Sequence, residues 1–191
     1  MTKKQEIISI VRDVIHSKGY QATSISDVLH AAKIGKGQFY HYFSSKHDLG
    51  LAVVEDLVQE LDNKLILDIL QTSEEPVSKL NNMLDWFMTS HTEMERKLGC
   101  PIGNLAIEMS EHDEEFRVRI AGFFDRWFES VEEVLNEMKK NNQLEITIDT
   151  KKSAQTMMAM IQGGILLMKN QQNNVLLNNV FDCIRKQFNL I

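Results

Sequence analysis

Cysteine and proline are scarce in this chain, which has two of each among its 191 residues. The two cysteines, Cys100 and Cys183, are too few and too far apart to form a disulfide scaffold, and no Cys/His spacing resembles a zinc site. Two prolines and nine glycines also leave little to interrupt helices. The scarcity excludes a disulfide-rich secreted domain, predicts no metal site and fits a reducing cytoplasm.

Long apolar runs are absent as well. The most apolar stretch, residues 157–168, contains Gln162 and two glycines and is well short of the ~20 residues that span a bilayer. The N-terminal sequence MTKKQEIISIV returns to charge at Arg12 and Asp13, without the apolar segment of a signal peptide. We therefore expect a soluble, cytoplasmic protein with no membrane partner.

The net charge of −6 is unevenly distributed along the chain. The first 50 residues contain seven Lys or Arg and four acids, a net charge of +3, whereas the remainder contains 14 basic and 23 acidic residues, a net charge of −9. Four of the six histidines also lie in the first 50 residues. The basic N-terminal segment is suited to a polyanionic partner, and the acidic remainder is not.

Apolar residues recur at three- and four-residue spacing through most of the chain, which predicts an all-α fold of about nine helices. Thr23 and Ser24 offer N-cap hydroxyls for the second helix, and the only β-like stretch, residues 144–148, is short enough to be a connector. The expected helices cover about 3–18, 24–33, 35–43, 45–70, 76–92, 100–110, 113–141, 151–169 and 174–189.

Three short helices followed by a longer one are typical of a helix-turn-helix domain that places one helix in a major groove. In the third helix, Phe39 and Phe43 lie four residues apart and are expected in the core. Lys36, Gln38 and His41 point away from this face: Lys36 is suited to phosphate, and Gln38 to an adenine edge. The predicted DNA contacts are Ser24, Ser26, Lys36, Gly37, Gln38, Tyr40, His41, Tyr42 and Lys46.

The segment TSISDVLHAAKIGKGQFYHYFSSKHDL, ending at Leu49, resembles the helix-turn-helix of the tetracycline-repressor (TetR) family. It departs from the family pattern at Leu29, where alanine is usual, at Lys33, where glycine is usual, and at Gly35, where serine usually caps the third helix. The resemblance implies a DNA-binding domain over residues 1–47 and an effector-binding and dimerisation domain over 48–191. It also implies a homodimeric repressor that leaves a palindromic operator when a small molecule binds.

The helix at 151–169 has apolar residues on two sides, more than one neighbouring helix can cover, so we expect a second subunit to pack on it. The resemblance implies a four-helix interface built from the last two helices of each chain. The alternative is that the paired glycines only kink a core helix of a monomer. The predicted dimer residues are Met160, Gly163, Gly164, Leu167, Val175, Val180 and Ile184.

Large adaptable side chains are concentrated in the middle of the chain, where similar repressors bind their effectors. Each of them taken alone is as well explained by ordinary core packing. As a set they predict a pocket for an apolar or aromatic small molecule of unknown identity. The predicted pocket residues are Met83, Trp86, Phe87, Cys100, Met109, Phe123, Phe124, Trp127, Met157 and Ile161.

Three alternatives remain open from the sequence. Cys100 precedes Pro101 at the start of a helix, where a thiol gains thiolate character, so a thiol-based repressor that senses electrophiles or oxidants is one alternative. A helical protein-interaction module is another. An enzyme would need a positioned catalytic pair, of which Cys100 with His91 or His112 is the best available, but no spacing brings them together. We therefore predict no catalytic residues and no cofactor. Cys183 is expected to be a packing residue.

Overall fold

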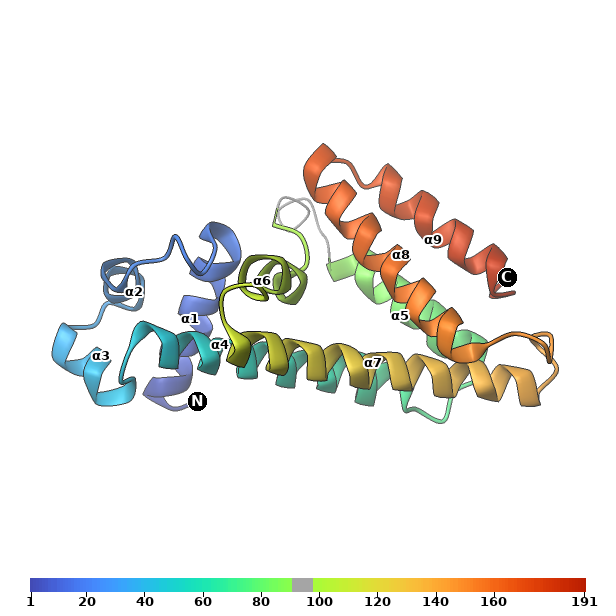
Figure 1. Cartoon of the computed structure of the whole chain (residues 1–191), viewed down its shortest axis with the longest axis horizontal. Helices are drawn as coiled ribbons and strands as arrows, with labels where there is room; N and C mark the ends of the chain where they lie inside the picture. Colours follow the sequence, from blue (N-terminus) through green and yellow to red (C-terminus); the bar gives the residue numbers. More distant parts are fainter. Residues whose placement is uncertain (91–97) are drawn as a thin grey trace. The chain divides into compact units, whose positions relative to one another are not determined.

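The computed structural model of the chain describes residues 1–90 and 98–191, and within these ranges it contains nine α-helices, one π-helix and no strand (Figure 1). The predicted all-α fold is confirmed. The elements are α1 (Lys3–Lys18), α2 (Ile25–Ala32), α3 (Lys36–Tyr42), α4 (Lys46–Leu61), η1 (Asp62–Leu70), α5 (Pro76–Ser90), α6 (Pro101–Met109), α7 (Glu114–Lys140), α8 (Thr150–Gln171) and α9 (Val175–Gln187).

The helix boundaries agree with the predicted ones to within a few residues, and residues 144–148 form turns and bends as expected. The predicted end of the fifth helix, at residue 92, lies outside the described residues. One feature was not predicted: the long helix expected over 45–70 changes from α to π at Asp62. A π-helix makes i→i+5 hydrogen bonds, which the spacing of apolar residues does not reveal over so short a segment.

The chain divides into two compact units. The first comprises Met1–Glu60 and Pro101–Gly122, and the second comprises Leu61–Cys100 and Phe123–Ile191. The first unit therefore contains the N-terminal helices, α6 and the beginning of α7. The expected functional boundary between residues 47 and 48 stays a prediction.

In the first unit, a capping box starts α1, in which the Thr2 hydroxyl accepts the N–H of Gln5. The helix ends at Gly19, whose φ of 89° is the kind of conformation that glycine adopts without strain. The apolar face of α1 buries Ile7, Val11 and Ile15. This face packs with α2 to form the base of the N-terminal three-helix arrangement.

A close approach between helices fixes the beginning of α4. Gly50 is buried, and a Cβ at this position would collide with the rings of Tyr20 and Phe116. Those two rings also contact each other, with centroids 4.8 Å apart. Only glycine lets the segment after α1 and the start of α7 pack on α4 this closely.

In the second unit, α8 and α9 pack along each other, and α5 contacts both η1 and α9. Gly164 is buried on α8, where an added Cβ would lie 3.0 Å from Leu177 Cδ1 and 3.5 Å from Val180 Cβ of α9. α9 buries Leu177, Phe181 and Ile184. Cys183 falls between these positions and is exposed, so its expected role in packing was wrong.

Among the described helices, none is both long enough and apolar enough to cross a bilayer.

Candidate nucleic-acid interface

A capping box orients the first turn of α2. The Ser24 hydroxyl accepts the N–H of Asp27 (3.1 Å), and the Asp27 carboxylate accepts the N–H of Ser24 (2.7 Å). Lys18 Nζ lies 2.8 Å from the same carboxylate. The bond from Lys18, followed by those from Ser24, holds the pKa of Asp27 well below its ordinary value. Ser24 and Ser26 are both exposed on this turn, and their contact with DNA stays a prediction.

The turn between α2 and α3 depends on Lys33, which has left-handed backbone angles (φ 53°, ψ 46°). This is the position at which glycine is usual, and the lysine adopts the glycine-like conformation despite its Cβ. Ile34 follows and is buried, which anchors the turn to the core. Gly35 is the N-cap of α3 and has no side chain to cap it. The departures from the family pattern therefore leave the helix-turn-helix geometry intact.

α3 has one aromatic face in the core and one polar face in solvent. Phe39 and Phe43 are 0% and 1% exposed, which confirms their predicted place in the core. Tyr40 is 52% exposed despite its large ring. Tyr42 is half-buried, with its ring centroid 4.8 Å from that of His41. The exposed residues of this helix are Lys36, Gly37, Gln38, Tyr40 and His41.

Gly37 has no role inside the first unit that the described residues reveal. No described heavy atom lies within 4 Å of where a Cβ would be, and its φ is not positive. Its predicted contact with DNA stays a prediction.

Lys46 does not extend freely into solvent. Its Nζ donates to the carbonyl of Gln21 (3.1 Å) and lies 4.5 Å from the centroid of the Tyr20 ring. Partial burial lowers its pKa, against the opposing effect of nearby carboxylates. The predicted contact of Lys46 with phosphate thus requires that the side chain exchange its intramolecular partner for DNA.

The helix-turn-helix is attached to α6 and α7 by polar contacts that the sequence did not predict. The Glu108 carboxylate accepts the backbone N–H groups of Tyr20 (3.0 Å) and Gln21 (2.7 Å). His47 Nε2 lies 2.8 Å from Asp113 Oδ2. These partners are 66 to 88 residues apart in sequence, and no local pattern indicates such pairs.

Burial disfavours the ionised form of Asp113, but three partners outweigh that effect and lower its pKa. These are the backbone N–H of Phe116, the side chain of His47 and the backbone N–H of Glu115. Asp113 therefore serves at once as the cap of α7 and as the partner of a histidine at the start of α4.

The predicted effector residues separate between the units. Met109 lies in the first unit, and the others lie in the second. In the second unit, Trp127 forms a buried cluster: its ring is stacked with that of Phe87 at 5.3 Å, and its Nε1 donates to Met83 Sδ (3.3 Å). The other rings near it are those of Phe123 (6.0 Å) and Phe124 (6.4 Å). Trp86 is half-buried beside Phe87, and Met157 and Ile161 are fully buried on α8.

Cys100 is 7% exposed, and Gln162 Nε2 lies 3.7 Å from its Sγ. A reagent in solution would reach this thiol only after local opening. Of the suggested catalytic partners, His91 lies outside the described residues, and His112 is exposed in the first unit. The described residues contain no group of three His, Cys, Asp or Glu side chains that fits a metal ion.

The predicted dimer residues fall into two classes. Ile184 and Gly164 are buried inside their own chain. Leu167 and Val175 are 45% and 56% exposed, and Leu166 beside them is 51% exposed. Met160, Gly163 and Val180 are partly exposed. α8 and α9 thus present large apolar side chains to solvent.

Two short helices joined by a tight turn, the second with polar residues on its outer face, are typical of helix-turn-helix proteins that regulate transcription. The family follows from comparison with known proteins. Residues 7–53 match the model of the bacterial regulatory proteins of the tetR family, and residues 76–183 match the C-terminal domain of LmrA/YxaF-like transcriptional regulators. The chain belongs to the TetR family of transcriptional regulators.

Individual relatives agree with this assignment over nearly the whole chain. An uncharacterised HTH-type regulator from the lacX 3′ region of Lactococcus lactis subsp. lactis is 35% identical, over 97% of this chain and 92% of its own length. The HTH-type transcriptional repressor DhaR of Mycobacterium sp. (strain GP1) is 25% identical, over 89% of this chain and 84% of its own length. The structure of a TetR regulatory protein from Rhodobacter sphaeroides is 26% identical and superimposes with a TM-score of 0.87, over 96% and 97% of the two chains.

Membership of a family of transcriptional regulators argues against the enzyme and protein-interaction alternatives.

Proposed function

We propose that the protein is a homodimeric repressor that binds a palindromic operator and leaves it when a small molecule binds its C-terminal domain. The observation that carries the proposal is the outer face of α3. Its exposed residues are Lys36, Gly37, Gln38, Tyr40 and His41, with the buried rings of Phe39 and Phe43 behind them. DhaR, a relative over most of the chain, is described as a repressor.

On this proposal α3 lies in the major groove. Gln38 reads a base edge, Lys36 and Tyr40 contact phosphates, and Gly37 lets the helix backbone approach the DNA closely. His41 and Tyr42 extend the contact at the end of the helix. Ser24, Ser26 and Lys46 contact the flanking backbone, Lys46 after leaving the carbonyl of Gln21.

Two copies are needed to occupy two half-sites, about 34 to 36 Å apart for successive major grooves. The exposed apolar residues of α8 and α9 support a dimer built on these helices, because side chains such as Leu167 and Val175 gain stability only when covered. Met160, Gly163 and Val180 extend that surface. Gly164 and Ile184 support it from inside the chain by letting α9 pack closely on α8.

The link to an effector is proposed to run through α6 and the start of α7. Glu108 and Asp113 hold the segment after α1 and the start of α4, so displacement of α6 would change the orientation of the reading helix. The aromatic cluster around Trp127 supports an apolar or aromatic effector in the second unit. Effector binding and operator binding would then share a coupling free energy of about 1 to 3 kcal/mol.

Selection of bound fragments from random duplexes would give the operator and its half-site spacing. Fluorescence anisotropy on that duplex then compares Gln38→Ala with Gln59→Ala, an exposed glutamine on α4. We expect Gln38→Ala to lower affinity for the operator by about 1 to 3 kcal/mol while affinity for random duplex is kept. Gln59→Ala should change neither affinity.

A second comparison uses Gly37→Ala, which the described structure accommodates without contact. We expect the unfolding temperature to be unchanged or slightly higher and the affinity for the operator to be lower. If Gln38→Ala and Gly37→Ala both left operator affinity unchanged, α3 would not be the reading helix.

A further inference from the structure

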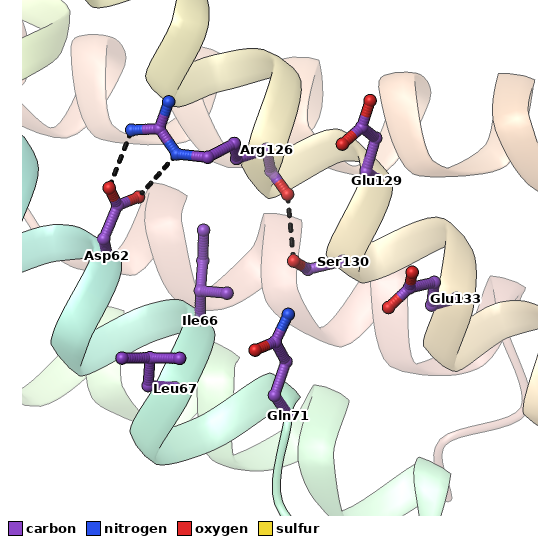
Figure 2. A pocket seen from close by; sticks show the side chains of 8 residues that line it. All are labelled: Asp62, Ile66, Leu67, Gln71, Arg126, Glu129, Ser130 and Glu133. Carbon is purple, nitrogen blue, oxygen red and sulfur yellow. Dashed lines mark hydrogen bonds and ion pairs between the residues drawn. The ribbon is translucent and has the colours of Figure 1, made fainter.

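The second unit contains a pocket of about 350 Å³ lined by η1 and α7 (Figure 2). We propose that it binds a small organic cation, namely an ammonium ion that carries a short apolar or aromatic arm. The pocket is separate from the aromatic cluster around Trp127, and the proposal does not depend on repression. Its lining residues are Asp62, Ile66, Leu67, Gln71, Arg126, Glu129, Ser130 and Glu133.

The π-helical conformation of η1 gathers half of this lining. In an α-helix with 3.6 residues per turn, positions nine residues apart, such as Asp62 and Gln71, would lie about 180° apart. A π-helix has roughly 4.4 residues per turn, which brings the same positions to within about 20°. The π-helical hydrogen bonding extends to Gln71, because its N–H donates to the carbonyl of Ile66 (2.8 Å), five residues earlier. The π-helical conformation of η1 thus forms one wall of the pocket.

The facing wall comes from α7 with ordinary α-helical spacing. Its four lining residues stand at intervals of three and four, so they share one face of the helix. The Ser130 hydroxyl donates to the carbonyl of Arg126 (2.9 Å), which leaves this small side chain turned onto its own helix. The middle of the wall is therefore low, with longer side chains around it (Figure 2).

The charges of the pocket do not cancel. Arg126 makes two bonds to the Asp62 carboxylate, from Nε (3.2 Å) and from Nη2 (2.7 Å), so these two charges compensate each other. Glu129 and Glu133 have no hydrogen bond or ion pair with any described residue. Two negative charges one helical turn apart therefore remain at the pocket, and their mutual repulsion favours a bound cation.

The apolar part of the lining selects the kind of cation. Ile66 is 6% exposed and forms a floor, whereas Leu67 is 54% exposed and offers its side chain at the edge. Among the described residues, no group of three or more His, Cys, Asp or Glu side chains fits a metal ion, and the lining of the pocket is partly apolar. A weakly hydrated ammonium group near the carboxylates, with its arm on Ile66 and Leu67, uses both features. The volume is in the range of pockets that hold small ligands.

The test is calorimetric titration of the full chain, without DNA, by benzyltrimethylammonium chloride at low ionic strength. We expect one saturable site per chain with a dissociation constant on the order of 0.1 to 1 mM. Benzyl alcohol and benzenesulfonate, which keep the aromatic ring without the positive charge, should bind at least about tenfold more weakly. Added sodium chloride should weaken the binding of the cation, because exposed charges are screened.

The location of the site is tested by Glu129→Gln together with Glu133→Gln. We expect this double variant to bind the cation about 5- to 25-fold more weakly, since each exposed carboxylate contributes up to about fivefold. Glu132→Gln, on the same helix but outside the pocket, should bind as the unchanged chain does. Both glutamates of the pocket are exposed, and an unchanged unfolding temperature confirms that the double variant folds.

Three outcomes would overturn the proposal: no saturable binding up to 10-fold above the expected range, equal binding of benzenesulfonate, or equal affinity in the double variant. The last would place the cation elsewhere, for example on the aromatic cluster. Operator binding is measured separately, so a failure to bind the cation says nothing against the reading helix, and the reverse also holds.

Discussion

The two units use their aromatic residues in different ways. In the first unit, the Tyr20 and Phe116 rings pack onto the backbone at Gly50, and carboxylates from α6 and α7 hold neighbouring backbone and side chains. In the second unit, rings stack on one another around Trp127, next to the flexible side chain of Met83. The first arrangement fixes the position of a backbone, as a DNA reader requires. The second buries large rings on one another beside a flexible methionine.

The largest effect is expected where the second unit depends on a single ring. Trp127→Ala removes a side chain that is 1% exposed and contacts three other rings, so it should lower the free energy of unfolding by about 3 to 5 kcal/mol. Trp86→Ala, at a half-buried position, should lower the free energy of unfolding by clearly less. Urea denaturation followed by circular dichroism measures both. Equal losses would show that the cluster does not depend on Trp127.

The next effect concerns the close packing of the first unit. Gly50→Ala gains about 1 kcal/mol of helix propensity but places a methyl group against two buried rings, which costs about 1 to 3 kcal/mol or more. We expect a net loss of stability. Gly37→Ala, where no described atom lies near, is the matched control and should be neutral or stabilising. A stable Gly50→Ala variant would mean that the Tyr20 and Phe116 rings move to accommodate the methyl group.

A smaller effect is expected for the polar contacts of α6. Glu108→Gln keeps one acceptor oxygen and loses the second, so one of the N–H groups of Tyr20 and Gln21 is left without its carboxylate. The expected loss is about 1 kcal/mol in urea denaturation, with weaker operator binding. Glu111→Gln, an exposed neighbour, should change neither. Unchanged operator affinity in Glu108→Gln would remove this residue from the proposed coupling.

The smallest effect is the pH dependence of Asp113, whose side chain is 20% exposed. Its pKa in the folded chain is lowered from the ordinary value of 3.8, so its ionised form adds stability above that value. That contribution is lost as the pH falls through the lowered pKa. Asp113→Asn should therefore be less stable than the unchanged chain at pH 6 and should approach it in strong acid. Thermal unfolding from pH 6 to pH 2 would test this, and a constant difference would contradict it.

Local patterns were sufficient for most of the fold. The spacing of Ile7, Val11 and Ile15 predicts α1, and the paired Phe39 and Phe43 predict the buried face of α3. These predictions succeed because helix formation and the burial of one helix face depend on neighbours three and four residues away. Lys33 falls at the turn position of the family pattern, and its backbone there is left-handed.

The predicted sites depended on more than local pattern. Met109 was grouped with the other pocket residues, yet it belongs to the first unit, because helical spacing does not tell which unit buries a residue. Cys183 was assigned to packing because its neighbours are apolar, but it lies between the buried positions of α9. The charged pocket at η1 had no signal in the sequence, since its lining follows π-helical spacing on one wall.

The amino-acid sequence by itself determined the helices, the order in which they follow, and the polar face of α3, because each of these is set by residues within a few turns of one another. Only the tertiary structure decided that Glu108 holds the backbone after α1, that Gly50 accepts two rings, and that η1 forms a pocket wall with α7. Those contacts join residues tens of positions apart, and their geometry depends on how the helices pack. Packing is a property of the folded chain as a whole, so no local window contains it.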